Sequence, residues 1–170
     1  MGGMVLIVLV AAYLAGPSLG FGRGWERENW PTRFQSNGER IYFTATSASG
    51  LPVSASGGGM HMQMHSGSCA TCHGGDRQGR RLMPRFWLVA PPLTPAALFN
   101  EHGDKSEDDG HGDHEGYDDA SLRRAITQGL DPSAQPLDRE MPRWTLADQD
   151  LADLIEFLKS PARNSRSPSH

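Results

Sequence analysis

The sequence lacks the motifs that mark several large functional classes. It has no Ser/His/Asp arrangement of the kind found in hydrolases, no phosphate-binding glycine loop, no nucleic-acid-binding motif and no internal repeat. Its formal net charge of −4 also argues against DNA as a partner. These absences direct attention to the few residues that can carry other chemistry, above all the two cysteines.

Hydrophobic residues are also scarce, at 37% of the 170 residues, while 20 glycines and 12 prolines interrupt the chain. A chain of this length can form one modest domain with its own core, but not two. The glycine and proline content predicts many loops and little strand.

One long apolar run is present, at residues 4–15 ("MVLIVLVAAYLA"), and no charged side chain precedes Arg23. This length suits the apolar core of a signal peptide better than a full membrane span, although the basic residues that usually precede such a core are missing. We therefore expect residues 1–22 to be a signal peptide or a retained membrane anchor. The chain would then work in the periplasm or on the outer face of the cytoplasmic membrane.

The remaining sequence divides by composition. Residues 23–37 are polar and predict a linker, residues 38–160 a single domain, and residues 161–170 a disordered tail. Within the domain, residues 48–59 are small and glycine-rich, which predicts a loop. Residues 101–119 hold nine acidic residues against one lysine, which is typical of a solvated insertion.

Apolar periodicity predicts three helices in the second half of the domain. A short one is expected at residues 94–100, a second at 118–129 ending at Gly129, and an amphipathic final helix at 145–161 with Thr145 as its N-cap. Residues 36–47 give conflicting signals, because a capping-box pattern favours a helix and apolar alternation favours a strand.

Both cysteines lie in "CATCH", Cys69 to His73. A thioredoxin-like pair would need a βαβ frame, a zinc site would need a distant fourth ligand, and a disulfide across two residues would stabilise little. Cys-x-x-Cys-His is instead typical of covalent haem c, in which the thiols of Cys69 and Cys72 bond to the haem vinyl groups and His73 ligates the iron. We predict one haem c.

The iron then needs a second axial ligand or an open face. Met141 is favoured because Pro142 follows it and the final helix comes next, so that a loop can fold back over the opposite haem face. The other candidates are methionines and histidines elsewhere in the chain: Met60, Met62, Met64, Met83, His61, His65, His102, His111, His114 and His170.

Two further segments could bind metal. The alternating methionines and histidines of residues 60–65 suit copper(I), but a flexible lead-in to the haem is the favoured interpretation. His102, His111 and His114 lie among carboxylates and could bind zinc or copper, but solvation of a charged loop is the simpler interpretation.

These features resemble the class I monohaem c-type cytochromes: "GERIYF" (38–43) the family's N-terminal helix, "CATCH" its haem motif, and "MPRW" before "LADQDLADLIEFLKS" (141–160) its methionine loop and C-terminal helix. The resemblance implies a mostly α fold, a small helical domain around one covalent haem with long irregular loops. It implies that Cys69 and Cys72 anchor the haem, that His73 and Met141 are axial ligands, and that residues 38–43 form a helix packed near Phe157.

By the same resemblance the protein is an electron carrier and not an enzyme. Its partners would be exported or membrane-bound redox proteins, such as a membrane oxidase or reductase. Two alternatives stay open: a haem enzyme or gas sensor with an open distal site, and a periplasmic copper-handling protein that uses residues 60–65. The sequence departs from the family pattern in the long stretch between the first helix and Cys69, and in the insertion at 101–119.

Charge is unevenly divided along the chain. Residues 101–119 carry 1 − 9 = −8, which leaves 15 − 11 = +4 for all other residues. Four of these bases, Arg77, Arg80, Arg81 and Arg85, lie within a dozen residues of His73, and Arg143 lies close after Met141. We expect the exposed ones to steer an acidic partner onto the haem edge, unless haem propionates and local acids neutralise them.

Overall fold

The structure is a computed structural model that describes residues 30–59, 67–82, 87–99 and 116–162. Within these ranges it has five helices and two small antiparallel sheets of two strands each. The helices are α2 (Asn37–Thr44), α4 (Cys69–His73), α5 (Pro95–Phe99), α6 (Asp119–Gln128) and α7 (Asp148–Lys159). The sheets pair β1 (Ser54–Ser56) with β4 (Arg143–Thr145), and β2 (Arg80–Arg81) with β3 (Val89–Ala90). The predicted mostly α fold with irregular loops is confirmed.

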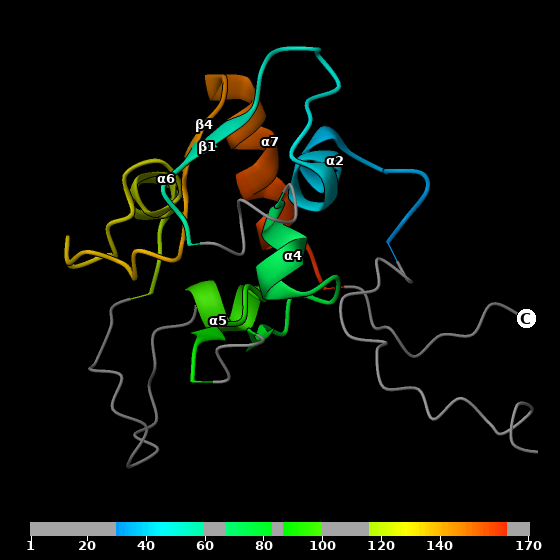
Figure 1. The fold of residues 1–170 in the computed structure, drawn as a ribbon. Coiled ribbons are helices and arrows are strands. Elements are labelled where there is room, and N and C mark those ends of the chain that lie inside the picture. The colour runs from blue at the N-terminus through cyan, green and yellow to red at the C-terminus, as the bar shows by residue number, and fades with distance from the viewer. Residues whose placement is uncertain (1–29, 60–66, 83–86, 100–115, 163–170) are drawn as a thin grey trace, which may run out of the picture.

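Helix α2 settles the conflict at residues 36–47. The Ser36 hydroxyl accepts a hydrogen bond from the Glu39 amide at 3.1 Å and so caps the helix. α2 packs across α7, as Figure 1 shows, and a side chain at Gly38 would overlap the α7 backbone. The Tyr42 and Phe157 ring centroids lie 5.3 Å apart, so the expected packing near Phe157 is confirmed.

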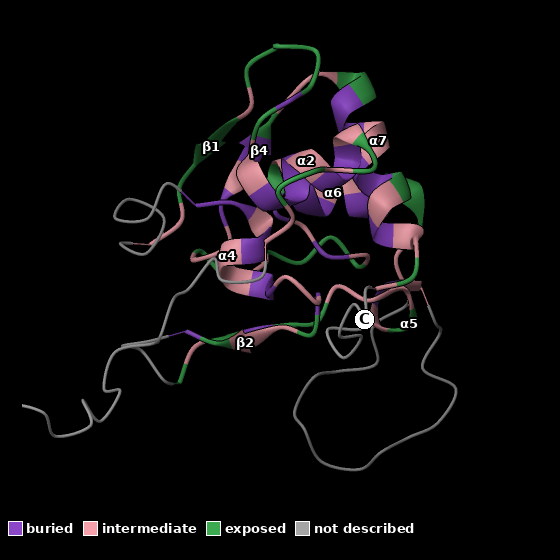
Figure 2. Ribbon diagram, turned by 90° about the vertical axis from the view of Figure 1, so that its right-hand side faces the viewer, coloured by how far each residue is buried: buried purple, intermediate pink, exposed green. Residues whose placement is uncertain are grey.

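The hydrophobic core is built around α7, which packs against both α2 and α6, with α4 below them in the view of Figure 1. The buried sides of these helices are visible in Figure 2. Trp30 and Phe34, which precede α2, also pack against this core. Its buried members are Ile41, Tyr42, Phe43, Ala70, Leu98, Leu122, Ile126, Trp144, Leu151, Leu154, Ile155 and Leu158.

Helix α6 follows its sequence signals closely. The Asp118 carboxylate accepts a hydrogen bond from the Ser121 amide at 2.6 Å, and Gly129 ends the helix with φ +70°. The short helix expected at 94–100 is α5. The start of the final helix was predicted wrongly, because α7 begins at Asp148 and Thr145 belongs to β4.

The β1–β4 pair also corrects the expectation that residues 48–59 are entirely loop. Ser54 pairs with Thr145, and Ser56 with Arg143. Nothing in the small polar residues of β1 signals a strand; the strand exists because a segment distant in sequence lies beside it. This pairing removes Thr145 from α7 and fixes the chain directly after Met141.

Several predicted segments lie outside the described residues: the apolar run, the methionine–histidine run at 60–65, most of the acidic insertion and most of the tail. The base of the insertion is described, and the Tyr117 amide donates to the Leu98 carbonyl at 2.7 Å. In the ranges that the structure does describe, no helix is both long enough and apolar enough to span a bilayer.

Candidate functional site

The Cys-x-x-Cys-His motif forms the single turn of helix α4. Ser68 and Thr71 begin the turn, since the Ser68 amide donates to the Thr71 hydroxyl at 3.0 Å. Gly74 ends it with φ +83°, and its amide donates to the Ala70 carbonyl at 3.0 Å. Cys69, Cys72 and His73 therefore come from one rigid turn, as the motif requires.

The two cysteines are half-buried and are not joined in a disulfide. Burial raises the pKa of Cys69 to about 12, and burial also raises the pKa of Cys72. Cysteines that catalyse thiol–disulfide exchange have lowered pKa values, so the site does not suit that chemistry. Among the described residues no three His, Cys, Asp or Glu side chains are grouped to hold a metal ion, which argues against a zinc site there.

His73 is buried, at 5% exposure, and its Nδ1 atom lies 2.8 Å from the Pro91 carbonyl oxygen. Because a carbonyl can only accept, Nδ1 carries the proton and Nε2 keeps its lone pair. Burial lowers the pKa of His73, while the Pro91 hydrogen bond acts in the opposite direction. The result is a neutral imidazole with a fixed ring orientation, the form that ligates iron.

Neighbouring elements hold α4 in place. The buried Tyr42 hydroxyl donates to the Gly74 carbonyl at 2.6 Å, which ties the end of α4 to α2. Arg80 Nη2 donates to the Ala70 carbonyl at 2.7 Å, which ties α4 to the β2–β3 hairpin. Burial raises the pKa of Tyr42, so its hydroxyl stays a donor at all physiological pH values.

Arg77 has a role that its sequence position did not suggest. It is only 2% exposed, and its guanidinium donates to the carbonyls of Phe157, Leu158 and Ser160 at 2.9, 3.0 and 2.6 Å. The guanidinium also lies over the Phe157 ring, 4.8 Å from its centroid. Arg77 therefore caps the C-terminus of α7 and is not part of an exposed basic surface.

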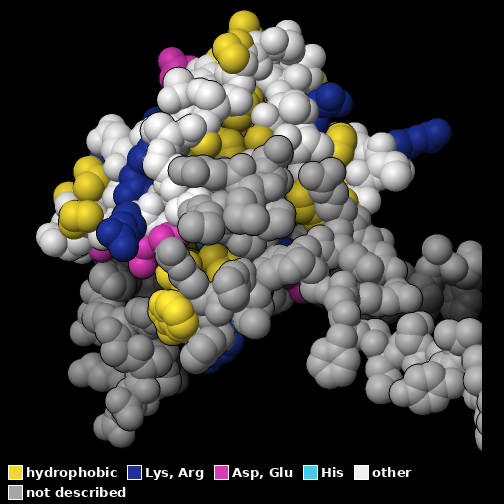
Figure 3. Space-filling model, in the orientation of Figure 1, with side chains coloured by type: hydrophobic (Ala, Val, Ile, Leu, Met, Phe, Trp, Pro, Cys, Tyr) yellow, Lys and Arg dark blue, Asp and Glu magenta, His cyan; other side chains and the backbone are white. Residues whose placement is uncertain are grey.

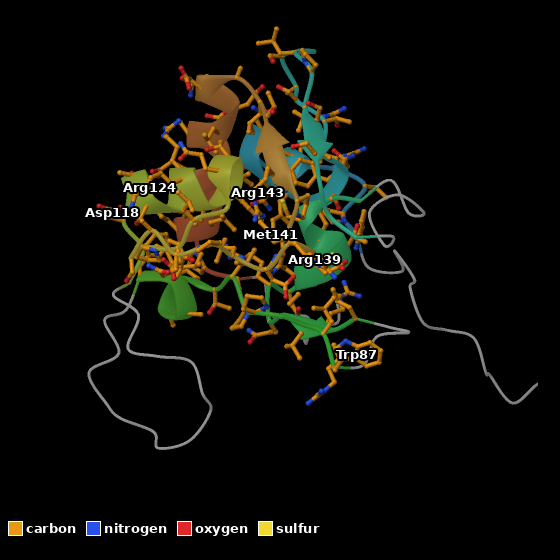
Figure 4. The ribbon with its side chains drawn as sticks, turned by 60° about the vertical axis from the view of Figure 1, so that its left-hand side comes forward. Trp87, Asp118, Arg124, Arg139, Met141 and Arg143 are labelled. Atoms are coloured by element: carbon orange, nitrogen blue, oxygen red, sulfur yellow. The ribbon has the colours of Figure 1, made fainter. Side chains whose placement is uncertain are left out.

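Met141 is half-buried and packs against the hydrophobic core, just before β4. Its amide donates to the Asp138 carbonyl at 3.0 Å. Figure 4 shows Met141 and Arg143 close together and Trp87 apart from them on the β2–β3 hairpin. The competing methionines and histidines at 60–65, with Met83, His102, His111, His114 and His170, lie outside the described residues.

The described residues fit a covalent haem. One helical turn carries two thiols that are free to form thioethers, followed by a buried imidazole whose Nε2 is available. A thioether, Met141, lies against the same core as Ala70 of this turn. The sequence names these residues as candidates but gives no sign of Pro91, whose contact with His73 is made by its carbonyl and leaves no side-chain signature.

Comparison with known families agrees with this chemistry. Residues 36–161 match the family model described as Cytochrome c, which covers most of the chain. No curated protein and no solved structure gives a significant match. The family match, the Cys-x-x-Cys-His turn and the mostly helical fold together imply a covalently bound haem c and an electron carrier in place of an enzyme. The chain therefore belongs to the cytochrome c family.

Proposed function

We propose that the protein transfers single electrons through one haem c ligated by His73 and Met141, and that it exchanges them with another redox protein. The observation that carries this proposal is the buried His73, whose Nδ1 is held by Pro91 beside two free thiols. Such an arrangement leaves Nε2 oriented and unprotonated, as a metal-ligating histidine requires.

A haem held by His73 and Met141 would supply one-electron chemistry. The chain's own residues supply the rest. Cys69 and Cys72 tether the group, Pro91 sets the direction of the His73 ring, and the apolar core around Met141 excludes water. Exclusion of water raises the reduction potential, because the extra positive charge of the oxidised state is poorly solvated.

Covalent attachment is tested by acid-acetone extraction of the mature protein. Haem should stay with the chain, and the double variant Cys69→Ala, Cys72→Ala should release it. Haem that extracts freely from the unaltered protein would contradict the proposal.

Ligation by Met141 is tested by substitution. Met141→Ala should remove the weak long-wavelength absorption band of a sulfur–iron(III) bond, open the reduced protein to carbon monoxide and lower the potential. The matched control replaces Met60, Met62 and Met64 with alanine together and should change none of these. A larger effect of the triple variant would show that the ligand lies among these three methionines and that the assignment to Met141 is wrong. Carbon monoxide binding to the unaltered protein would favour a gas sensor or haem enzyme.

The partner is proposed to dock on the β2–β3 hairpin. Trp87 and Val89 are 67% and 54% exposed there, Arg81 is exposed beside them, and the chain continues to Pro91. On the face drawn in Figure 3, several described Lys and Arg side chains lie together along the left-hand side, and others lie separately at the upper right. Because Arg77 is buried, we expect apolar contact at Trp87 to contribute more than charge. Trp87→Ala should then slow exchange with a protein partner more than with hexacyanoferrate.

The site of action is proposed to be the periplasm or the outer face of the cytoplasmic membrane, as either a soluble carrier or a subunit of a membrane oxidase or reductase. The apolar run at residues 4–15 supports this location. Fractionation of cells that express the full chain tests it, and haem-loaded protein confined to the cytoplasm would contradict it.

A further inference from the structure

The segment that leads to Met141 is folded back on itself. It leaves α6 at Gly129, and the Leu137 amide returns to donate to the Gly129 carbonyl at 2.8 Å. A second, tighter turn follows, in which the Met141 amide donates to the Asp138 carbonyl at 3.0 Å. These bonds shape the segment but leave the carbonyls of Leu137 and Met141 to be satisfied by another group.

Arg143 supplies that group. Its guanidinium Nη1 donates to the Met141 carbonyl, and Nη2 donates to the Leu137 carbonyl at 3.2 Å. The planar fork of arginine can make both bonds at once, whereas a lysine ammonium is a single point of charge. One side chain therefore links both turns of the segment.

Gly129 makes room for this contact. A side chain at position 129 would overlap the Arg143 guanidinium, and the φ of +70° there also favours glycine. The end of α6 and the guanidinium are therefore packed backbone to side chain, with no intervening group.

The anchor of Arg143 is itself rigid. Its backbone lies in β4, opposite Ser56 of β1. The next residue, Trp144, is 6% exposed and belongs to the hydrophobic core. Because alternate residues of a strand point to opposite faces, burial of Trp144 directs Arg143 away from the core and toward the segment.

From these contacts we propose that Arg143 is a positioning residue that holds the Met141 backbone so that its thioether stays on the iron. This inference rests on the proposed ligation by Met141. Without the guanidinium, the turn at 138–141 would lose its link to α6 and β4, and the thioether would leave the iron more often. A competing ligand then binds more tightly, because it no longer has to displace a firmly held sulfur.

Imidazole binding to the oxidised holoprotein is the test, with the sulfur–iron(III) band and urea unfolding recorded on the same samples. Arg143→Met keeps the apolar stem and removes the donors, and should tighten apparent imidazole binding roughly tenfold, equivalent to about 1.4 kcal/mol. Arg143→Lys should fall between Arg143→Met and the unaltered protein. Gly129→Ala should act in the same direction by displacing the guanidinium. Arg139→Met is the matched control, since Arg139 is exposed in the same segment and should leave imidazole affinity unchanged.

Met141→Ala distinguishes a failure of the proposed ligation by Met141 from a failure of the proposed role of Arg143. If it changes neither the band nor imidazole affinity, the ligand assignment fails and the role of Arg143 fails with it. If Met141→Ala tightens imidazole binding but Arg143→Met and Gly129→Ala do not, the ligand stands and the positioning role is overturned. A loss of urea stability in Arg143→Met at unchanged imidazole affinity also overturns it, since that is the result of a purely structural role.

Discussion

The capping of α7 by Arg77 gives a prediction whose size can be worked out. Arg77 follows the haem motif by four positions, yet its guanidinium binds the last carbonyls of a helix at the other end of the sequence. It is nearly inaccessible to water, at 2% exposure. The informative change is Arg77→Met, which keeps a flexible apolar stem and removes every donor.

Three hydrogen bonds are lost in this variant, and each contributes about 1 kcal/mol net. The interaction of a cation with the helix C-terminus adds about 0.5–1 kcal/mol. Methionine recovers part of this, because it needs no desolvation of a charge and can pack on Phe157. We expect the free energy of unfolding to fall by about 2–3 kcal/mol.

Urea unfolding of the holoprotein, followed by far-ultraviolet circular dichroism, measures this loss through the transition midpoint and slope. Arg139→Met is the control, because Arg139 is exposed and its replacement should change stability by less than about 0.5 kcal/mol. If Arg77→Met is no more destabilising than Arg139→Met, the C-terminal cap contributes nothing and the reasoning is wrong. Arg77→Lys should lose less than Arg77→Met, since the charge remains near the helix end.

Three other changes give clear expectations. Gly38→Ala should destabilise the fold by about 1–3 kcal/mol in urea unfolding, because the added methyl group overlaps the α7 backbone. The hydrogen bonds from Ser121 lower the pKa of Asp118. The stabilisation from this cap is therefore present above the ordinary aspartate pKa and is lost as pH falls through the lowered value. On acidification below about pH 4, Asp118→Asn should lose less stability than the unaltered protein does. Deletion of residues 101–115 removes 1 − 7 = −6 in charge, and should preserve the haem spectrum while accelerating oxidation by anionic hexacyanoferrate and changing its salt dependence. Loss of haem in that variant would show that the insertion is not dispensable.

The elements that the sequence predicted well carry local signals. α6 has its cap residue, its apolar face and its terminal glycine within one short segment, and α4 has its donors on a single turn. α2 needed more, since its local pattern was ambiguous and only the family resemblance favoured a helix. Gly38 shows the physical reason. Its lack of a side chain permits close contact with α7, but the local sequence pattern does not reveal that another helix packs there.

The errors and omissions have the opposite origin. The prediction that Thr145 is an N-cap rests on the amphipathic run that follows it, but pairing with Ser54 places Thr145 in a strand. Because arginine is usually exposed, the sequence predicts Arg77 to be a surface base, yet its guanidinium binds three carbonyls at the end of α7. Pro91 could not be found at all, because it acts through its backbone. In each case the deciding contact joins residues that are distant in sequence or belongs to the main chain.

The same non-local contacts explain how the chain departs from the family pattern without losing the site. The extra residues before Cys69 include β1, whose pairing with β4 turns part of a connecting stretch into support for the segment after Met141. The chain on the two sides of the acidic segment is joined by a hydrogen bond, in which the Tyr117 amide donates to the Leu98 carbonyl at 2.7 Å. A loop whose ends are already joined by the domain adds only a slowly growing entropic cost as it lengthens. The stretch before Cys69 and the acidic insertion therefore both join the domain at residues that the packed helices and strands hold in place. α4 keeps its contacts with α2 through Tyr42 and with the hairpin through Arg80.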